Sequence, residues 1–579
     1  MKGLGTIALF ALTLMSVGCN NQSEKEKPMN VILIITDDQG YGDLAFHGNP
    51  EIETPVLDQF EKESTEFTRF YVSPVCAPTR ASLLTGRYHL RTGTSWVTHR
   101  KEVMQSEEVT LAEVFKENGY RTGLFGKWHN GKQYPHDPIG QGFEQFIGFT
   151  DGHLNNYFDP VLTSQFEEQK MEGYSTDIFT DHAIDFMTDQ EAPFFSMISY
   201  NTPHSPFQVA DKYYNKYKTR GLNDKGATVY GMVENIDENI GRIRNHLQEI
   251  GLANNTMIIF MTDNGPNGWR YNNGLKGRKA HVDEGGVRVP FIIHHPQKPD
   301  WSNQKINEMA AHIDVLPTLA DLLSLQTPKD LAMDGISLVP MLSGEKSEDR
   351  FFFTHQVSWD FDTIPGAIRN HEFVLTRKRD GDELYQLIDD SVQHHNLAQE
   401  RPELVRELAE NYEKWLSDVT SEGLIPPPIE VGHLKVPLIV FPAPDASSFI
   451  DLTFKGGSGW ANDWFVGWQK DSKATWNIKV VSEMAYEVLL ELSVPSAAGQ
   501  FSLHCHDKTI TLEINSPYEA TTVVNQDRVP RGEVEEKVWP LVSMGKLKLP
   551  IGNHELTLAA NTEMDSLMEV KSIKMVPSN

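Results

Sequence analysis

The sequence predicts an α/β protein with a mostly parallel central sheet, followed by a second, all-β domain. Two continuous aliphatic runs, Asn30–Ile35 and Met257–Thr262, have the composition of strands that are buried on both faces, as in parallel sheets. Strand-like and helix-like patterns alternate around them, which is typical of α/β folds. Beyond residue 440, apolar and polar residues alternate with a period of two, which indicates an antiparallel β-sandwich.

The composition is that of a soluble globular protein with room for several domains. The chain has 579 residues, of which 39% are hydrophobic and 23% are charged. Its formal net charge of −28 argues against nucleic acid as a partner, because phosphate binding needs a basic surface. An anionic ligand must therefore be attracted by local positive charge.

The N-terminus predicts an export signal over residues 1–18 and a tether over 19–28. Lys2 precedes a short apolar run that ends at Gly18 and Cys19, and this run is too short for a typical membrane span. The small residue before Cys19 resembles a bacterial lipoprotein cleavage site, which predicts lipidation of Cys19. Plain secretion is the alternative, because Ser16 stands where such sites usually have an aliphatic residue. We therefore expect an exported protein, periplasmic, in the outer membrane or at the cell surface, with the lipid as its only membrane contact.

Oxygen-bearing side chains follow the two buried strands. Asp37 and Asp38 come directly after the first strand, and Asp263 and Asn264 come directly after the run at 257–262. The carboxyl ends of strands form ligand sites in open α/β sheets, and oxygen ligands are what Ca²⁺ or Mg²⁺ requires. Solvated turn acids would be the better reading of a single pair, but the recurrence favours a metal site. No Cys/His cluster points to zinc.

A lone cysteine lies at a predicted helix start within Pro74–Gly86. Pro78 suits the first turn of a helix, so Cys76 should lie at or just before the helix N-terminus, where anions are attracted. Arg80, one turn later, would direct its donors to the same place. This arrangement suits an oxyanion, while a buried free thiol is the alternative that the spacing leaves open.

The segments in between predict further strand–helix units. Thr110–Glu113 predicts a capping box. Predicted strands at 120–125 and 193–198 lead into polar motifs that contain Lys127, His129 and His204. Apolar residues on one face predict a core-packing helix, and they are Val229, Val233, Ile236, Ile240, Ile243 and Leu247.

Two further units are predicted after this α/β domain, which we bound at 29–345. Short strands and a helix from about 402 to 417 predict a small subdomain over 346–424, and the Pro-rich start of 425–440 predicts a linker. Residues 441–579 predict the β-sandwich, a kind of module that often binds carbohydrate. Three tryptophans there, Trp460, Trp464 and Trp468, suit either a sugar-stacking platform or, as the favoured reading, an aromatic core.

The motif Cys76-Ala77-Pro78-Thr79-Arg80, with its tail Leu83–Gly86, resembles the signature of the formylglycine-dependent sulfatases. In that family a maturation enzyme oxidises the cysteine to Cα-formylglycine (3-oxoalanine). The other polar motifs occur in the order of the family, from Asn30 to beyond Arg288. The resemblance implies an alkaline-phosphatase-like fold with a small antiparallel C-terminal subdomain.

The resemblance also implies one Ca²⁺ and a set of ligands for it. Asp37, Asp38, Asp263 and Asn264 would bind the ion, with the formylglycine at position 76 also near it. The hydrated aldehyde would supply the hydroxyl that attacks sulfur, and its second hydroxyl would let the aldehyde re-form as sulfate leaves.

Five basic residues receive roles from the same resemblance. Arg80 and Lys127 would stabilise the hydrated aldehyde, and Lys127, His204 and Lys279 would hold the sulfate. Lys279 is chosen over its neighbours because the family places its lysine five residues before the glutamate of Glu284–Arg288. His204 or Lys279 would protonate the leaving group, and His129 would accept the proton of the second hydroxyl.

The implied substrate is a sulfated polysaccharide or oligosaccharide. Export, acidity and the β-domain favour a marine algal glycan such as ulvan over an animal glycosaminoglycan. Arg100, Trp269 and Arg270 are candidate substrate-binding residues, with a solvated loop face as the equal alternative. Rival functions are a phosphonate or phosphodiester hydrolase of the same superfamily and a non-catalytic glycan-binding protein. A zinc alkaline-phosphatase relative lacks support, since its additional His/Asp metal ligands are not apparent.

Overall fold

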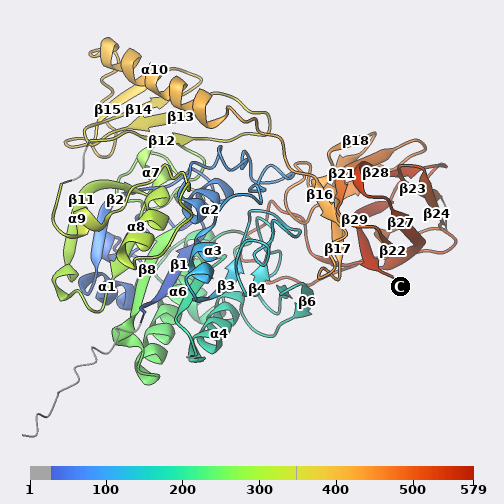
Figure 1. Ribbon diagram of the computed structural model, residues 1–579, viewed down its shortest axis with the longest axis horizontal. Coiled ribbons are helices and arrows are strands. Elements are labelled where there is room, and N and C mark those ends of the chain that lie inside the picture. The colour runs from blue at the N-terminus through green and yellow to red at the C-terminus, as the bar shows by residue number, and fades with distance from the viewer. Residues whose placement is uncertain (1–27, 190, 347–348, 498, 579) are drawn as a thin grey trace, which may run out of the picture.

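The computed structural model describes residues 28–189, 191–346, 349–497 and 499–578. The predicted export signal and almost all of the predicted tether, including Cys19, lie outside these residues. The described chain forms an α/β domain, a small subdomain beside it and a β-domain at the C-terminus (Figure 1). None of its helices is both long and apolar enough to cross a membrane.

A mixed sheet with a parallel centre forms the middle of the α/β domain. The strand order is β11-β2-β10-β8-β1-β7-β3-β4-β5-β6, with β9 paired to β2. The central strands β8, β1, β7, β3 and β4 are parallel, which confirms the predicted fold class. The strands are β1 (Asn30–Thr36), β2 (Thr65–Tyr71), β3 (Arg121–Lys127), β4 (Gln145–Phe149), β5 (Val161–Ser164), β6 (Glu167–Lys170), β7 (Phe194–Ser199), β8 (Thr256–Thr262), β9 (Arg288–Val289), β10 (Phe291–His294) and β11 (Gln304–Ala311).

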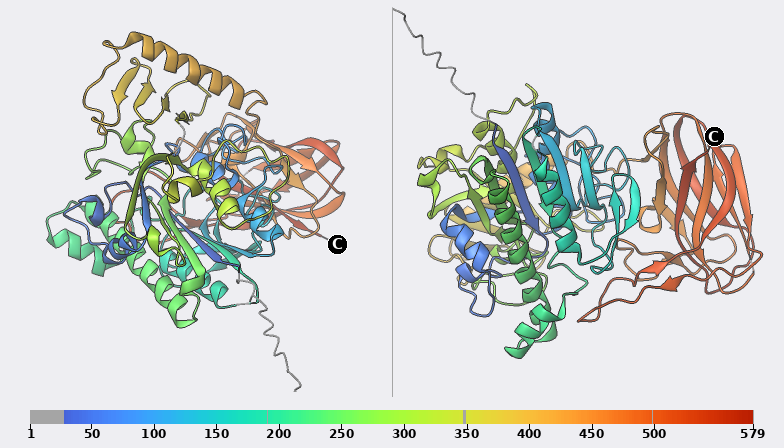
Figure 2. Two further views of the ribbon diagram at one scale, coloured as in Figure 1. Left: turned by 60° about the vertical axis from the view of Figure 1, so that its left-hand side comes forward. Right: turned by 90° about the horizontal axis from the view of Figure 1, so that it is seen from below.

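Helices cover both faces of this sheet (Figures 1 and 2). Ile32 and Ile34 of β1 pack in one core, with side chains of α1 (Pro55–Lys62), α4 (Ser175–Thr188), α5 (Asp211–Thr219) and α6 (Asp224–Glu249). Val31, Leu33 and Ile35 pack in the other, with side chains of α2 (Cys76–Thr85), α3 (Leu111–Glu117), α8 (Val315–Leu322) and α9 (Val339–Leu342). Burial on both faces is why β1 has no polar alternation.

Two local sequence predictions in this domain are confirmed. The side chain of Thr110 accepts a hydrogen bond from the backbone of Glu113, whose own side chain accepts one from Thr110, so α3 begins with a capping box. All six residues of the predicted apolar stripe are buried on α6. Short elements complete the domain: α7 (Glu284–Val287) and the 3-10 helices η1 (Ala45–His47), η2 (Ala253–Asn255), η3 (Pro299–Trp301) and η4 (His312–Asp314).

The small subdomain is a four-stranded antiparallel sheet with one long helix, α10 (Pro402–Val419). Its strands are β12 (Phe352–His355), β13 (Gly366–Arg369), β14 (Phe373–Arg377) and β15 (Glu383–Gln386). The apolar side of α10 packs on this sheet and on Tyr71 and Val287 of the α/β domain, so the two units share a core.

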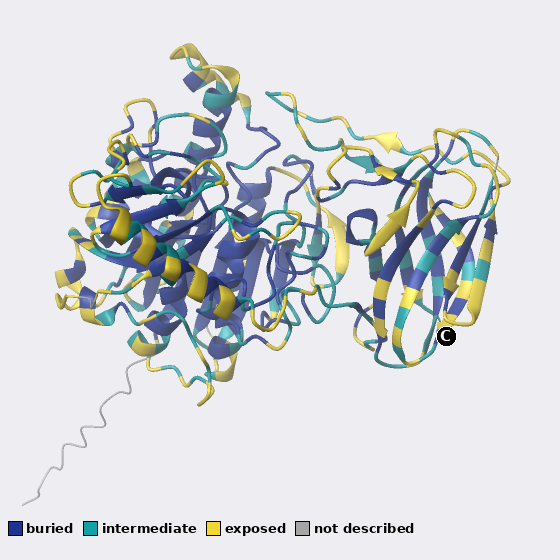
Figure 3. Cartoon of the chain, turned by 90° about the horizontal axis from the view of Figure 1, so that it is seen from above, coloured by how far each residue is buried: buried dark blue, intermediate teal, exposed yellow. Residues whose placement is uncertain are grey.

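The C-terminal domain contains two facing sheets around one hydrophobic core, as the period-two pattern predicts (Figure 3). One sheet has the order β16-β21-β28-β23-β24 with β18 beside β21, and the other has β19-β20-β29-β22-β27 with β17 beside β29. The elements are β16 (Ile429–Val431), β17 (Ile439–Pro442), η5 (Ala443–Asp445), β18 (Ser448–Ile450), β19 (Thr453–Phe454), β20 (Phe465–Val466), β21 (Lys473–Val480), β22 (Met484–Ser493), β23 (Gln500–Cys505), β24 (Lys508–Glu513), β25 (Thr521–Thr522), β26 (Lys537–Val538), β27 (Leu541–Leu549), β28 (Gly552–Ala560) and β29 (Glu569–Pro577).

The segment expected to be a linker, 425–440, is built into this domain. Its strand β16 pairs in parallel with β21, and Ile429 and Val431 are buried in the β-domain core. Of the three tryptophans, Trp464 and Trp468 are buried, whereas Trp460 is 45% exposed. The aromatic core reading therefore applies to two of them and leaves Trp460 at the surface.

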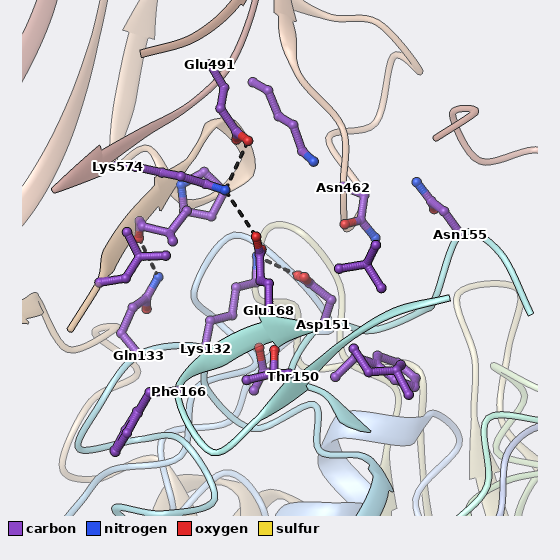
Figure 4. Close-up of a pocket in the computed structure, with 18 of the residues that line it drawn as sticks. Lys132, Gln133, Thr150, Asp151, Asn155, Phe166, Glu168, Asn462, Glu491 and Lys574 are labelled. Carbon is purple, nitrogen blue, oxygen red and sulfur yellow. Dashed lines mark hydrogen bonds and ion pairs between the residues drawn. The ribbon is translucent and has the colours of Figure 1, made fainter. Parts of the chain in front are cut away.

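A cavity of about 500 Å³ lies between the α/β domain and the β-domain and is lined by residues of both (Figure 4). Two of its lysines are paired with carboxylates: Lys132 contacts Asp151 at 2.9 Å, and Lys574 contacts Glu491 at 3.0 Å. Neither Asp37, Asp38 nor Cys76 lines it. This cavity is thus a feature of the domain interface, and the predicted site lies elsewhere.

Candidate functional site

The carboxyl ends of two neighbouring strands bring the four predicted oxygen ligands together. β1 and β8 are paired in parallel with Thr36 opposite Thr262, so Asp37 and Asp263 leave the sheet side by side. Ligand atoms of Asp37, Asp263 and Cys76 lie within 4.8 Å of one another. Asn264 donates a hydrogen bond of 2.8 Å to Asp38. The register of the sheet therefore forms the cluster.

Cys76 is the first residue of α2, as the position of Pro78 predicts. Its side chain is buried, and every residue of this helix is buried with it. Burial raises the pKa of the Cys76 thiol, although the charges of Lys127 and Lys279 act in the opposite direction. The helix ends at Gly86, whose φ of +68° suits glycine at a helix C-terminus.

Each carboxylate of the cluster has one cation. Arg80 contacts Asp263 at 2.8 Å and Lys127 contacts Asp37 at 2.7 Å, with all four side chains essentially inaccessible to solvent. Lys279 contacts Asp38 at 2.6 Å. Burial opposes ionisation of Asp38, but the charges of Lys279 and His204 outweigh it and hold its pKa below the usual range. Two buried ion pairs and a third whose lysine is 18% exposed thus surround Cys76.

The oxygen atoms of the cluster that have no hydrogen-bond partner fit a bound cation. Asp37 Oδ1, Asp38 Oδ2 and Asn264 Oδ1 are buried acceptors without a hydrogen-bond partner among the described residues. Burial, with repulsion by the charge of Asp37 adding to it, raises the pKa of Asp263 to about 6, although Arg80 and Lys127 act in the opposite direction. A divalent ion with oxygen ligands would satisfy these atoms and relieve that repulsion.

His129 is held as a neutral base. Its Nε2 lies 2.8 Å from the carbonyl of Val97, which can only accept, so Nε2 carries the proton. Its Nδ1 is buried and has no described partner. Burial and the charge of Lys127 lower the pKa of His129 well below the ordinary value. The ring therefore offers an unprotonated nitrogen beside the cluster.

His204 faces the cluster from the segment after β7. Its Nδ1 lies 2.5 Å from the carbonyl of Ser205, and its Nε2 lies 3.6 Å from Asp38 Oδ2. Burial lowers the pKa of His204 to about 4 even though Asp38 acts against it. A neutral Nε2 and a carboxylate oxygen are both acceptors, so they face each other across a place that suits a donor or a cation.

The three predicted substrate-binding residues have different surroundings. Arg100 is buried and donates to the carbonyl of Pro427 at 2.8 Å, so it joins the α/β domain to the β-domain. Arg270 is paired with Asp43 and also donates to the backbone of Asp38, so it supports the loop of the cluster. Trp269 is 74% exposed, and the guanidinium of Arg278 lies over its ring.

Sequence reasoning missed three residues near this cluster, namely His153, Lys225 and Glu533, and it considered Arg278 only as a neighbour from which Lys279 was chosen. His153 stacks at 6.3 Å on His204, and Glu533 accepts a hydrogen bond from Ser205. Lys225 interacts electrostatically with both Asp38 and Glu533. No local pattern distinguishes these residues from ordinary loop residues, and Glu533 is contributed by a different domain.

Comparisons with known proteins agree with this geometry. The family model described as "Sulfatase" matches residues 29–325, and that described as "N-sulphoglucosamine sulphohydrolase, C-terminal" matches residues 277–421. The chain is 31% identical to an N-acetylgalactosamine-6-sulfatase of Sus scrofa over 366 residues, which are 56% of this chain and 68% of that protein. The corresponding Mus musculus protein is 30% identical over 386 residues, covering 60% and 71%.

A solved structure is similar over a comparable length. It is described as Ps i-CgsB in complex with k-i-k-neocarrahexaose, and it superposes with a TM-score of 0.63 at 28% sequence identity. The similarity covers 67% of this chain and 93% of that chain.

Proposed function

The chain belongs to the sulfatase family and is a sulfuric ester hydrolase, and from this premise we propose that it acts through a formylglycine at position 76 and one Ca²⁺. The observation that carries the proposal is the convergence of Asp37, Asp38 and Asp263 with their three cations around a cysteine at a helix start. We also propose that a formylglycine-generating enzyme modifies Cys76.

Both groups fit the side chains present. The oxygens of Asp37, Asp38, Asp263 and Asn264 would hold the ion, since three of these residues have a buried oxygen without a partner. An aldehyde hydrate supplies a nucleophilic hydroxyl and Ca²⁺ supplies positive charge against sulfate oxygens.

The protein's own residues then position charge and protons. Lys127 and Arg80, fixed by their ion pairs, place positive charge next to residue 76. Lys279 stays protonated, because its bond to Asp38 and the neighbouring negative charges outweigh burial and raise its pKa. It can therefore hold a sulfate oxygen. The free Nδ1 of His129 can accept a proton.

We propose a sulfated glycan as substrate, with a marine algal polymer such as ulvan favoured. The similar proteins support the glycan class: two are named N-acetylgalactosamine-6-sulfatases, and the similar structure holds a neocarrahexaose. The exposed rings of Trp269 and Trp460 suit stacking on a saccharide.

We also propose that the protein is exported and that Cys19 carries a lipid. The short apolar run before Gly18 and Cys19 supports this. Mass spectrometry of the N-terminal peptide, isolated from membranes of the producing cell, tests it: an unmodified Cys19 on a full-length chain would contradict the proposal.

A panel of esters tests the activity. The protein, co-expressed with a formylglycine-generating enzyme, is incubated with 4-nitrophenyl sulfate, matched phosphate and phosphonate esters, and oligosaccharides of chondroitin sulfate, carrageenan and ulvan. We expect release of sulfate from at least one oligosaccharide, measured by ion chromatography. Faster release of phosphate or phosphonate than of sulfate would contradict the proposal, as would Cys76 that stays a thiol in an active preparation.

A further inference from the structure

A loop of the β-domain lies on the α/β domain next to the catalytic cluster. This loop, residues 523–536, connects β25 to β26, and the right-hand view of Figure 2, from below, shows a loop of the β-domain extending back towards the α/β domain. The backbone of Arg528 donates to the carbonyl of Phe207 at 2.9 Å, and Asp527 accepts from Gln208 at 2.7 Å. Val529 packs against the core of the α/β domain. The loop is therefore anchored at several points.

Glu533 is the residue of this loop that reaches the cluster. One carboxylate oxygen accepts a hydrogen bond from Ser205, the neighbour of His204. Burial opposes ionisation of Glu533, but His153, the bond from Ser205 and His204 outweigh it and keep its pKa below the ordinary value. The hydroxyl of Ser205 thus links Glu533 to His204, whose Nδ1 lies 3.5 Å from that hydroxyl oxygen.

Its second oxygen, Oε2, is buried and has no hydrogen-bond partner among the described residues. The same holds for Nε2 of His153, a residue that is only 6% exposed. Two buried polar atoms from two domains thus lack partners, although buried polar groups are normally hydrogen-bonded. A ligand with hydroxyl or amide groups would satisfy them.

The β-domain also fixes the second of these residues. Asn462 donates to the backbone carbonyl of His153 at 3.2 Å (Figure 4 shows Asn462 beside Asn155). Arg531, two residues before Glu533, donates to the carbonyl of Asn155 at 3.0 Å. The exposed ring of Trp460 lies next to Gly532, where an added Cβ would be 3.9 Å from it. The exposed ring of Trp460 thus lies next to the loop that carries Glu533.

We propose that Glu533 and His153 bind hydroxyl groups of the sugar that carries the sulfate, so that the β-domain is part of the active site. This inference rests on the proposed function. A carboxylate accepts a hydrogen bond from a hydroxyl but repels a second sulfate, so Glu533 also selects sugars with a free hydroxyl next to the sulfate ester that is cleaved. Glu533 is therefore a specificity-determining residue.

The test compares two substrates in three variants. Glu533→Ala and Glu533→Gln are compared with Glu535→Ala, which removes a charge from an exposed residue of the same loop. The substrates are 4-nitrophenyl sulfate, which has no sugar hydroxyls, and the chondroitin sulfate, carrageenan or ulvan oligosaccharide that the wild type hydrolyses fastest. Thermal unfolding verifies that the variants are folded.

We expect Glu533→Ala to lower kcat/KM for the oligosaccharide about 10- to 100-fold while 4-nitrophenyl sulfate changes less than about twofold. Glu535→Ala should leave both unchanged. Glu533→Gln should retain more oligosaccharide activity than Glu533→Ala and should hydrolyse a disulfated oligosaccharide better than the wild type does.

The outcomes separate the two proposals. Equal losses on both substrates would show that Glu533 only positions His204 through Ser205, and unchanged rates on both would show that it does not contribute; either result overturns the inference. A wild-type protein that releases sulfate from none of the oligosaccharides would instead contradict the proposed function itself.

Discussion

The catalytic cluster has an inner and an outer region that differ in how their charges are satisfied. The inner region consists of residues from strand ends, α2 and the loop before α7 of one domain: Asp37, Asp38, Cys76, Arg80, Lys127, Asp263 and Lys279. Its carboxylates and cations are paired one to one and almost wholly buried. The outer region consists of His153, Lys225, Arg278 and Glu533, which come from loops and the start of α6 and from two domains. Among the described residues no ion pair joins a charge of this region, and His153 Nε2 and Glu533 Oε2 are buried without a hydrogen-bond partner.

This difference separates chemistry from selectivity. Paired, buried charges have fixed positions, which suits groups that must be arranged before the substrate arrives. Unpaired groups at the edge keep their hydrogen-bonding capacity for a ligand. The structure thus indicates that the reaction is determined by the α/β domain and that the choice of sugar involves the β-domain.

The largest effect should come from the centre of the inner region. Cys76→Ala removes the only side chain that can become the nucleophile, so we expect kcat/KM for 4-nitrophenyl sulfate to fall at least about 10⁴-fold. Cys505→Ala is the matched control, because Cys505 is also a buried free thiol but lies in the β-domain. Activity of Cys76→Ala within tenfold of the wild type would remove residue 76 from the mechanism.

The next effect concerns stability. Arg80→Met leaves Asp263 as a buried charge without its cation, which should lower the free energy of unfolding by about 3–5 kcal/mol in urea titrations. Arg379→Met breaks an ion pair whose side chains are 69% and 41% exposed, and it should cost less than about 1 kcal/mol. Equal losses of unfolding free energy in the two variants would mean that buried ion pairs contribute no more to stability than exposed ones.

Chelation tests whether the unpartnered oxygens hold a cation. With Ca²⁺ at 100 times its Kd, the folded protein should gain about 2.7 kcal/mol over the chelated protein, visible as a higher Tm in calorimetry. Asp37→Asn should show a smaller difference between the Ca²⁺ and chelator samples, since one ligand charge is lost. A wild-type Tm that is the same in both samples would argue against the ion.

A buried histidine behind the cluster makes stability depend on pH. His312 is 1% exposed, contacts Ser73 through Nε2, and has a pKa that burial lowers to about 3. As the pH falls, His312 is therefore protonated in the unfolded chain before it is protonated in the folded chain. Stability decreases for this reason as the pH falls from about 6.5 towards 3. At pH 5 the loss from this residue is about 2 kcal/mol.

His312→Gln measures that contribution. Its free energy of unfolding, from urea titrations at pH 7 and pH 5, should fall less between the two values than that of the wild type. The same slope in both proteins would show that His312 does not titrate in this way.

The smallest effect should come from the outer region. Lys225 is partly buried, and burial lowers its pKa, with Arg270 adding to the effect. Lys225→Met should raise KM for the sulfated oligosaccharide about fivefold, equivalent to about 1 kcal/mol, and leave 4-nitrophenyl sulfate almost unchanged. Lys218→Met, at a surface pair with Asp224, serves as the control. A larger effect on the aryl ester would place Lys225 in the inner region.

The two regions also differ in how far sequence could predict them. Asp37 and Asp263 follow strands whose aliphatic runs are unmistakable, and parallel pairing alone brings such strand ends together. The helix start at Cys76 follows from Pro78. Local patterns were sufficient because the inner region is formed by local elements in a regular sheet.

The outer region depends on contacts that no local pattern encodes. Arg100 looks like a free cation in a basic loop, but its partner Pro427 is far away in the chain and covers it. Arg270 likewise forms an ion pair with a residue far away in the chain, Asp43. Glu533 reaches Ser205 only because the two domains dock, and docking between domains cannot be read from period or spacing.

The burial of Cys76 also sets an order of events during synthesis. The thiol lies within a helix whose ten residues are all buried, so no second protein could reach it in the folded chain. An enzyme that modifies this side chain must therefore bind the segment around it as an extended peptide, before the helix packs under the sheet ends. Competence for catalysis would then be decided while the chain is still unfolded, and a molecule that folds too early would stay inactive for its lifetime.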